Sequence, residues 1–303
     1  MTYSIVAFDR EANQWGVAVQ THPLSVGAWV PWLQPGVGAI ATQASTNVGF
    51  GPLGLQLLAG GLSAQQTLAA LLATDSDAAR RQVAVLDRTG NVATHTGERC
   101  IPFAAHRQGA AYSVQANMML KDTVPDVMVH AFETTPGALA ERLMATLEAA
   151  EAEGGDIRGM GSAGLIVVDG DHGAAWQHTV CNLRVDQADQ PLVALRRLVA
   201  QHQATLIYRT GHAQLLAGDW QAAIDSFTAA RDHAPDATEM QYWQAIALAA
   251  QPAAHPEARR LLADLLAHEP QWHALTERML AYQLFEQPTA VAELLTSVDQ
   301  GGL

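Results

Sequence analysis

Threonine at position 2 is the strongest candidate for a catalytic residue in this chain. Removal of Met1, which the small size of threonine permits, would leave a hydroxyl and a free α-amine on the same residue. An α-amine has a pKa of about 7.7 to 8.0, so near neutral pH a good fraction is unprotonated and can accept the hydroxyl proton. Thr2 is therefore predicted to be a nucleophile that carries its own general base.

Amide and hydroxyl side chains near two apolar runs form the next group of candidates. Thr42, Gln43 and Asn47 follow the run GVGAIA, and Asn117 lies within SVQANMM. Asn47 and Asn117 can donate to an oxyanion, so we predict both to be catalytic, while Thr42 and Gln43 are predicted to bind substrate. The alternatives are that Thr42, Gln43 and Asn47 cap the end of a strand, and that the Asn117 side chain supplies hydrogen bonds at a β-bulge.

Three charged or titratable residues complete the predicted site. Asp156 and Arg158 lie in the glycine-rich loop GGDIRGMG, where they can orient a substrate carboxylate or, equally well, pair with each other. His22 follows a predicted strand and would lie near Thr2 if that strand pairs with the first one. All three are predicted to bind substrate, with an exposed loop position as the alternative for His22.

Strand-like runs must position these side chains. TYSIVAFD and WGVAVQT flank REANQ and predict an N-terminal hairpin that starts at Thr2. Helices are predicted in LGLQLLAGG, after a capping box at Ser63 and Gln66, and across 124–152. Further strands are predicted in GVGAIATQAST, QVAVLD, VATHTG, AAYSVQANMM and SAGLIVVD, and a loop in the proline-containing segment 23–35. Hairpins that alternate with helix pairs favour an α+β fold, a four-layer αββα sandwich of two sheets with helices outside.

A glycine pattern at Gly49, Gly51 and Gly54 matches the dinucleotide-binding fingerprint, with Asp75 about 20 residues further on. That fingerprint belongs at the end of the first strand of a βαβ unit, whereas here a hairpin comes first and Pro52 interrupts the turn. We interpret the pattern as a glycine turn that enters a helix.

The composition changes near Ala200, which predicts two domains, 1–199 and 200–303. The second is rich in Ala, Leu, Gln and His with helical spacing, and Ala223, Phe227 and Pro235 recur 35 residues later as an alanine, a leucine and a proline. The segment GHAQLLAGDWQAAIDSFTAARDHAPD resembles the tetratricopeptide pattern, which implies an all-α helical repeat domain.

A series of motifs in the first domain resembles, in order, the family known as domain of unknown function 1028. These motifs run from about Thr2 to Leu198 and include TYSIVAFDREANQWGVAVQT, GVGAIATQASTN, GPLGLQLLAGGLSAQQTL, TGERC, VQANMM, GGDIRG and LRVD. That family looks like the N-terminal-nucleophile hydrolases, whose αββα fold begins with a strand that bears the nucleophile at its first residue. The resemblance implies that Thr2 has this role. One departure is Gly161, which stands where the family usually has a glutamine before the serine.

The composition excludes several classes of partner. The 17 basic and 30 acidic residues give a net charge of −13, which repels nucleic acid and anionic lipid. No apolar stretch is long enough to span a membrane and no signal-peptide pattern begins the chain, so we expect a cytoplasmic protein. The 12 histidines and the two cysteines show no ligand spacing, so we expect no metal and no cofactor.

The residues and the resemblance together predict an amidohydrolase that acts on a small amide or peptide through Thr2. The alternative is a non-catalytic module that binds a metabolite or peptide and recruits a protein through its helical repeats. We expect a homo-oligomer, with a small-molecule or peptide amide as substrate and a protein partner for the repeats.

Overall fold

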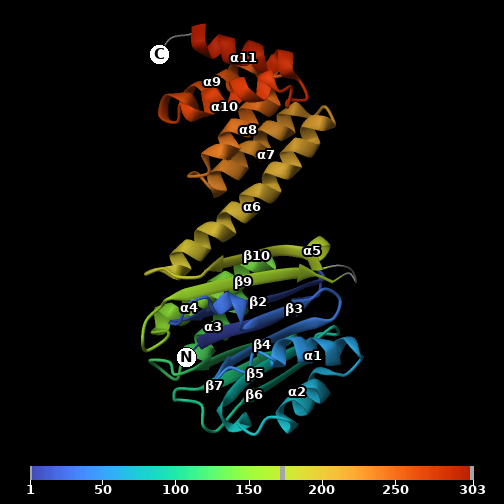
Figure 1. Cartoon of the computed structure of the whole chain (residues 1–303), viewed down its shortest axis with the longest axis vertical. Coiled ribbons are helices and arrows are strands. Elements are labelled where there is room, and N and C mark those ends of the chain that lie inside the picture. Colours follow the sequence, from blue (N-terminus) through green and yellow to red (C-terminus); the bar gives the residue numbers. More distant parts are fainter. Residues whose placement is uncertain (1, 171–174, 301–303) are drawn as a thin grey trace. The chain divides into compact units, whose positions relative to one another are not determined.

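The computed structural model describes residues 2–170 and 175–300 and divides into two compact units, Met1–Val199 and Ala200–Leu303. The first unit combines helices with two antiparallel sheets, whereas the second is helical (Figure 1). In both described segments, no helix is long and apolar enough to cross a membrane.

The larger sheet has six strands in the order β10-β9-β2-β1-β8-β7, and the smaller has four in the order β3-β4-β5-β6. Strand β1 lies in the middle of the larger sheet, between its hairpin partner β2 and the distant β8. The strands are β1 (Thr2–Asp9), β2 (Gln14–Thr21), β3 (Pro31–Gln34), β4 (Gly38–Ala44), β5 (Arg81–Asp87), β6 (Val92–Thr96), β7 (Ala105–Gly109), β8 (Tyr112–Asn117), β9 (Ser162–Asp169) and β10 (Thr179–Val185).

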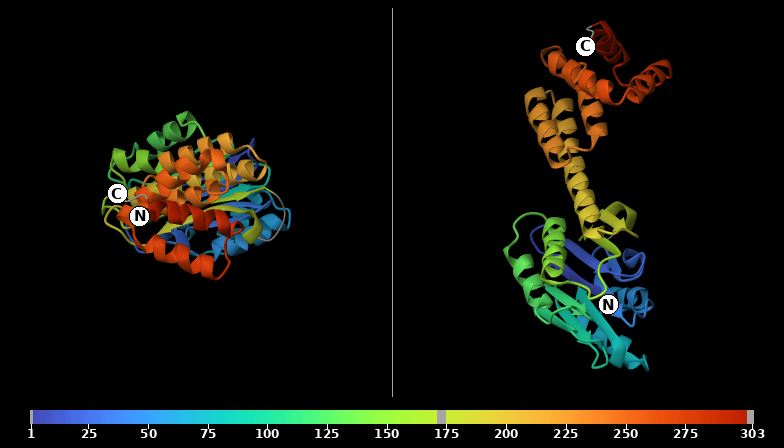
Figure 2. Two further views of the ribbon diagram at one scale, coloured as in Figure 1. Left: turned by 90° about the horizontal axis from the view of Figure 1, so that it is seen from above. Right: turned by 90° about the vertical axis from the view of Figure 1, so that its left-hand side faces the viewer.

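Helices cover the outer face of each sheet. Tyr3 and Ile5 of β1 pack in one apolar cluster with α3 (Val124–Thr134) and α4 (Leu139–Glu153), because alternate side chains of a strand point to the same face. Val6 points the other way, toward the smaller sheet. The outer face of that sheet is covered by α1 (Phe50–Ala59) and α2 (Ala64–Ala73), so the layers run helix, sheet, sheet, helix (Figure 2).

Local signals placed most of these elements correctly. The N-terminal hairpin and the β5–β6 hairpin are confirmed, and the capping box is present, with Ser63 Oγ accepting from the Gln66 amide and Gln66 Oε1 accepting from that of Ser63. Three strands were not predicted: β3, β7 and β10. All three lie at sheet edges, where one side has no ladder partner and the apolar alternation is weak. The predicted loop around Pro31 is wrong because proline is tolerated as the first residue of an edge strand.

The glycine pattern at positions 49–54 serves packing. A Cβ on Gly51 would lie 2.2 Å from the Trp32 ring, and one on Gly54 would lie 2.4 Å from Ile40 Cδ1. Helix α1 can therefore approach β3 and β4 only where side chains are absent.

The second unit is built from helices with a core of its own around Phe227 and Tyr242. Gly211 lies against Phe227, since a Cβ there would be 2.8 Å from the ring. Helix α6 crosses the position of the composition change at Ala200, so the composition marks a change in packing partner and not a break in the backbone. The helices are α6 (Pro191–Leu216), α7 (Trp220–His233), α8 (Thr238–Leu248), α9 (His255–His268), α10 (Gln271–Ala281) and α11 (Pro288–Gln300).

Candidate active site

Thr2 begins β1 and lies directly opposite Asn117, the last residue of β8. It is 2% exposed, and its Oγ1 lies 3.2 Å from the Oγ1 of Thr21, the last residue of β2. The hydroxyl is thus buried at the point where three central strands of the larger sheet begin or end. Because Thr2, Ser4 and Val6 alternate with residues that face the helices, the Thr2 side chain points toward the smaller sheet.

Two amides hold the Thr2 carbonyl. Gln43 Nε2 and Asn117 Nδ2 each donate to Thr2 O at 3.2 Å. The same two nitrogens also donate to Gln82 Oε1, at 2.7 Å from Gln43 and 2.9 Å from Asn117. Gln82 in turn donates to Ala116 O at 3.0 Å and to Thr96 Oγ1 at 2.9 Å. Residues from both sheets therefore hold the start of β1.

The network continues along β1 and β8. Ser4 Oγ donates to Gln43 Oε1 at 2.6 Å and accepts from Gln115 Nε2 at 2.6 Å, while Ser113 Oγ donates to Gln115 Oε1 at 3.1 Å. All of these side chains are at most 2% exposed. The space between the sheets is thus polar at the Thr2 end and apolar toward Val6, Trp15 and Leu86. Buried amides that are fully hydrogen-bonded fix one geometry, since any shift leaves a polar group unpaired.

The structure separates the candidates that follow β4. Gln43 joins the Thr2 network, but Thr42 points to the opposite face of the strand, and its Oγ1 donates to Asn47 O at 3.1 Å. Asn47 Nδ2 donates to Asp75 Oδ2 at 3.2 Å, and its Oδ1 accepts from Gly49 N at 3.1 Å. The described contacts of Thr42 and Asn47 therefore lie in the segment between β4 and α1, and not in the Thr2 network.

Asp156 and Arg158 pair with each other. Arg158 Nη2 lies 3.1 Å from Asp156 Oδ2, which also accepts from the His22 backbone amide at 3.2 Å. The Asp156 carboxylate is completely buried, whereas the His22 side chain is exposed. This pair fixes the loop before β9 against the end of β2, one residue beyond Thr21, which favours the loop ion pair over direct substrate binding.

Gly161 is required by close backbone approach. Its amide donates to Thr21 O at 3.0 Å, and a Cβ at this position would lie 1.8 Å from His22 O. No side chain fits there in this arrangement, so glycine at this position matches the close contact between the loop and β2.

A cavity of about 480 Å³ adjoins the network. It is lined by Ala44 and Met118, which directly follow Gln43 and Asn117, and by Arg80, Arg99 and nearby residues of the β6–β7 connection. Ala44 and Met118 both have positive φ, of 68° and 58°, in the left-handed region that non-glycine residues seldom adopt. Such backbone conformations cluster at functional sites, and here both turn the chain away from the Thr2 end of the sheets.

A polar pair of the buried Tyr3 and the partly buried Glu151 lies on the helix-facing side of β1. Tyr3 Oη donates to Glu151 Oε2 at 2.7 Å. Burial raises the pKa of Glu151, and burial together with Glu151 raises the pKa of Tyr3 well above its ordinary value. The pair joins β1 to α4 behind the Thr2 site.

Ser4, Thr21, Gln82, Ser113 and Gln115 were not predicted as part of the site. Each is a polar residue at an inward position of an otherwise apolar strand. Their alternation was visible in TYSIVAFD, RQVAVLD and YSVQAN, but no single-strand pattern shows that these positions face one another across two sheets. Within residues 2–170 and 175–300, no group of three or more His, Cys, Asp or Glu side chains could hold a metal ion.

The fold and the site define an α+β unit with a threonine at the head of a central strand and a buried amide network behind it. Residues 2–195 match the model of a family of unknown function, DUF1028, and the chain belongs to that family. It is similar to the protein SPO2555 from Silicibacter pomeroyi, a crystal structure assigned to the same family, with 32% identity and a TM-score of 0.60. The match covers 65% of this chain and 84% of that chain. No curated protein matches the chain.

Proposed function

We propose that the protein is an N-terminal-nucleophile amidohydrolase that acts on a small amide or peptide through Thr2 after removal of Met1. The observation that carries the proposal is the position of Thr2, the first residue of a central strand, at the polar end of the space between two sheets. The order helix, sheet, sheet, helix supports the αββα class of this superfamily.

The proposed reaction has two steps. The Thr2 Oγ1 attacks the amide carbonyl carbon while the α-amine takes the hydroxyl proton and then passes it to the leaving nitrogen, so that the C–N bond breaks and an ester to Thr2 forms. Water then attacks the ester carbonyl, with the α-amine again as base, and releases a carboxylic acid and the free hydroxyl. An amine with a pKa near 8 suits both roles at neutral pH.

Gln43 and Asn117 act as positioning residues in this proposal. The two N–H groups of the Asn117 amide match its two acceptors, Thr2 O and Gln82 Oε1. To stabilise the oxyanion, Asn117 would have to exchange its bond to the Thr2 carbonyl for one to the substrate, so backbone N–H groups are the alternative donors.

The cavity beside the network supports a substrate that carries an anion. Two arginines, Arg80 and Arg99, line it. The Arg99 side chain is exposed and has no ion-pair partner in the described part of the chain, whereas Arg80 lies 3.7 Å from Asp77. A guanidinium binds a carboxylate with two parallel hydrogen bonds, so the preferred substrate is an amide that also bears a carboxylate.

The helical unit supports a second part of the proposal, a tetratricopeptide-like module that binds a protein partner. Phe227 fills the space left by Gly211 of the preceding helix, as the repeat pattern predicts.

Intact mass, N-terminal sequencing and an amide-hydrolysis screen test the hydrolase. The screen should include N-acyl amino acids and matched uncharged amides. We expect a mature chain that starts at Thr2, loss of hydrolysis in Thr2→Ala, partial activity in Thr2→Ser, and full activity in the control Thr134→Ala, an exposed helical threonine. Full activity in Thr2→Ala, or an active protein that retains Met1, contradicts the mechanism. A free Thr2 amine with no hydrolysis of any amide supports the non-catalytic alternative.

A further inference from the structure

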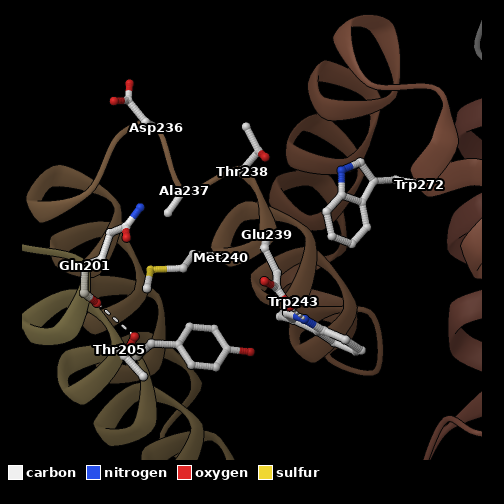
Figure 3. Close-up of a pocket in the computed structure, with 10 residues that line it drawn as sticks. Gln201, Thr205, Asp236, Ala237, Thr238, Glu239, Met240, Trp243 and Trp272 are labelled. Carbon is white, nitrogen blue, oxygen red and sulfur yellow. Dashed lines mark hydrogen bonds between the residues drawn. The ribbon is translucent and has the colours of Figure 1, made fainter. Parts of the chain in front are cut away.

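A cavity of about 620 Å³ lies in the helical unit. It is lined by α6, by the loop before α8, by the first turns of α8, and by α10 (Figure 3). This volume falls in the range of cavities that hold a ligand larger than a single ion. The lining residues are Gln201, Thr205, Tyr208, Asp236, Ala237, Thr238, Glu239, Met240, Trp243 and Trp272.

Two tryptophans on separate helices face this cavity, and both are held by the buried Tyr242. The Tyr242 ring stacks on Trp272 at 4.6 Å between centroids and meets Trp243 edge-on at 5.0 Å. The Tyr242 hydroxyl is in turn bonded to Thr276 Oγ1 at 2.9 Å. The indoles are therefore fixed from behind while remaining partly exposed.

Each indole N–H is bonded to a carboxylate. Trp243 Nε1 donates to Glu239 Oε1 at 3.1 Å, and Trp272 Nε1 donates to Glu269 Oε2 at 2.9 Å. An indole has one donor and no acceptor, so these bonds place negative charge at the ring edges. The π-faces that Tyr242 does not cover are the remaining surface for a ligand.

The charge of the lining has one sign. Its charged members, Asp236 and Glu239, are both acidic, and no arginine or lysine is among the described lining residues. Glu239 is exposed and forms no ion pair within the described helices. The whole unit from residue 200 onward has twelve acidic residues, five arginines and no lysine. An aromatic face beside carboxylates favours a cationic ligand, because the cation–π interaction and the attraction between opposite charges act together.

We propose that this cavity binds an arginine- or lysine-bearing segment of a partner protein, with the cationic group between the tryptophans and Glu239. The Gln201 side-chain amide lines the cavity and supplies a donor and an acceptor for the partner's backbone. The inference rests on the proposed partner-binding role of the helical unit and does not depend on hydrolase activity.

The test follows the indole N–H signals of Trp243 and Trp272 by NMR on the full chain, assigned with Trp→Phe variants. The probe is a capped five-residue peptide with a central arginine between alanines. We expect saturable shifts of these two signals, weaker binding by about fivefold in Glu239→Gln, and no change in Glu293→Gln, an exposed glutamate on α11. Affinity should fall as salt is raised.

Two further ligands distinguish the alternatives. A peptide with leucine in place of arginine should not shift these signals, and equal binding by it overturns the cationic requirement. Methylguanidinium should bind much more weakly than the peptide, and equal affinity overturns the choice of a protein segment as the ligand. If the arginine peptide shifts neither signal, the cavity is not a site for cations.

Discussion

Two fully buried glutamines, Gln43 and Gln20, should respond differently to replacement by leucine. Gln43 accepts from Ser4 at 2.6 Å and donates to Gln82 at 2.7 Å and to Thr2 O at 3.2 Å. Neither amide atom of Gln20 meets a hydrogen-bond partner among the described residues. Both side chains are 0% exposed, and leucine has a similar size to glutamine without its polar atoms.

Gln43→Leu leaves the Ser4 hydroxyl without its acceptor and weakens the contacts of Thr2 and Gln82, which keep Asn117 as a partner. An unsatisfied buried donor costs about 1–3 kcal/mol and a lost bond about 1 kcal/mol, so we expect the free energy of unfolding to fall by about 2–4 kcal/mol. Gln20→Leu removes a buried amide that is already unpaired, and we expect it to be neutral or to stabilise the unit by about 1 kcal/mol.

Scanning calorimetry of the full chain measures both changes, and hydrogen exchange in β1 assigns the transition to the first unit. For about 200 residues, 1 kcal/mol corresponds to about 2–4 °C, so Gln43→Leu should lower Tm by about 4–16 °C while Gln20→Leu leaves it unchanged or higher. Equal losses in the two variants would show that burial, and not the hydrogen-bond network, decides the response. A loss below about 2 °C for Gln43→Leu would refute the stabilising role of the network.

Three further outcomes follow from the structure. Arg99→Ala should raise KM for a carboxylate-bearing amide about tenfold and keep kcat within twofold of the unmodified protein. Arg88 is an exposed arginine at the far end of β5, and Arg88→Ala should change neither constant; a lowered kcat with unchanged KM in Arg99→Ala would contradict the anion site. Burial raises the pKa of Glu151 above its usual 4.5, so the folded state holds the proton more tightly and the free energy of unfolding should decline as pH rises through the raised pKa. In urea-unfolding measurements across pH, Glu151→Gln should remove this decline, and an unchanged dependence of the unfolding free energy on pH would exclude Glu151 as its source. Phe227→Ala should cost about 3–5 kcal/mol in the helical unit, with amide protection lost there but kept in β1 and β9; simultaneous loss in both units would show that they unfold as one.

Edge strands show where sequence patterns lose their predictive value. The hairpins β1–β2 and β5–β6 were predictable because the apolar runs and the turns between them are local. Strands β7 and β10 are polar or half-exposed, and they are strands because a neighbour of the same sheet offers its backbone groups. That neighbour is visible only after the chain has folded.

The sequence by itself determined the family, the hairpin that begins at Thr2, and the change to helical spacing near Ala200, because these depend on the order and periodicity of residues along the chain. Only the tertiary structure decided which polar residues meet Thr2. Thr42 and Gln43 are adjacent in sequence yet face opposite layers, since successive side chains of a strand alternate. Gln82 lies opposite Gln43 on the neighbouring strand of the smaller sheet. The two glutamines reach Asn117 and Thr2 O because two sheets pack face to face, and these contacts, which no local pattern encodes, join residues 35 or more positions apart.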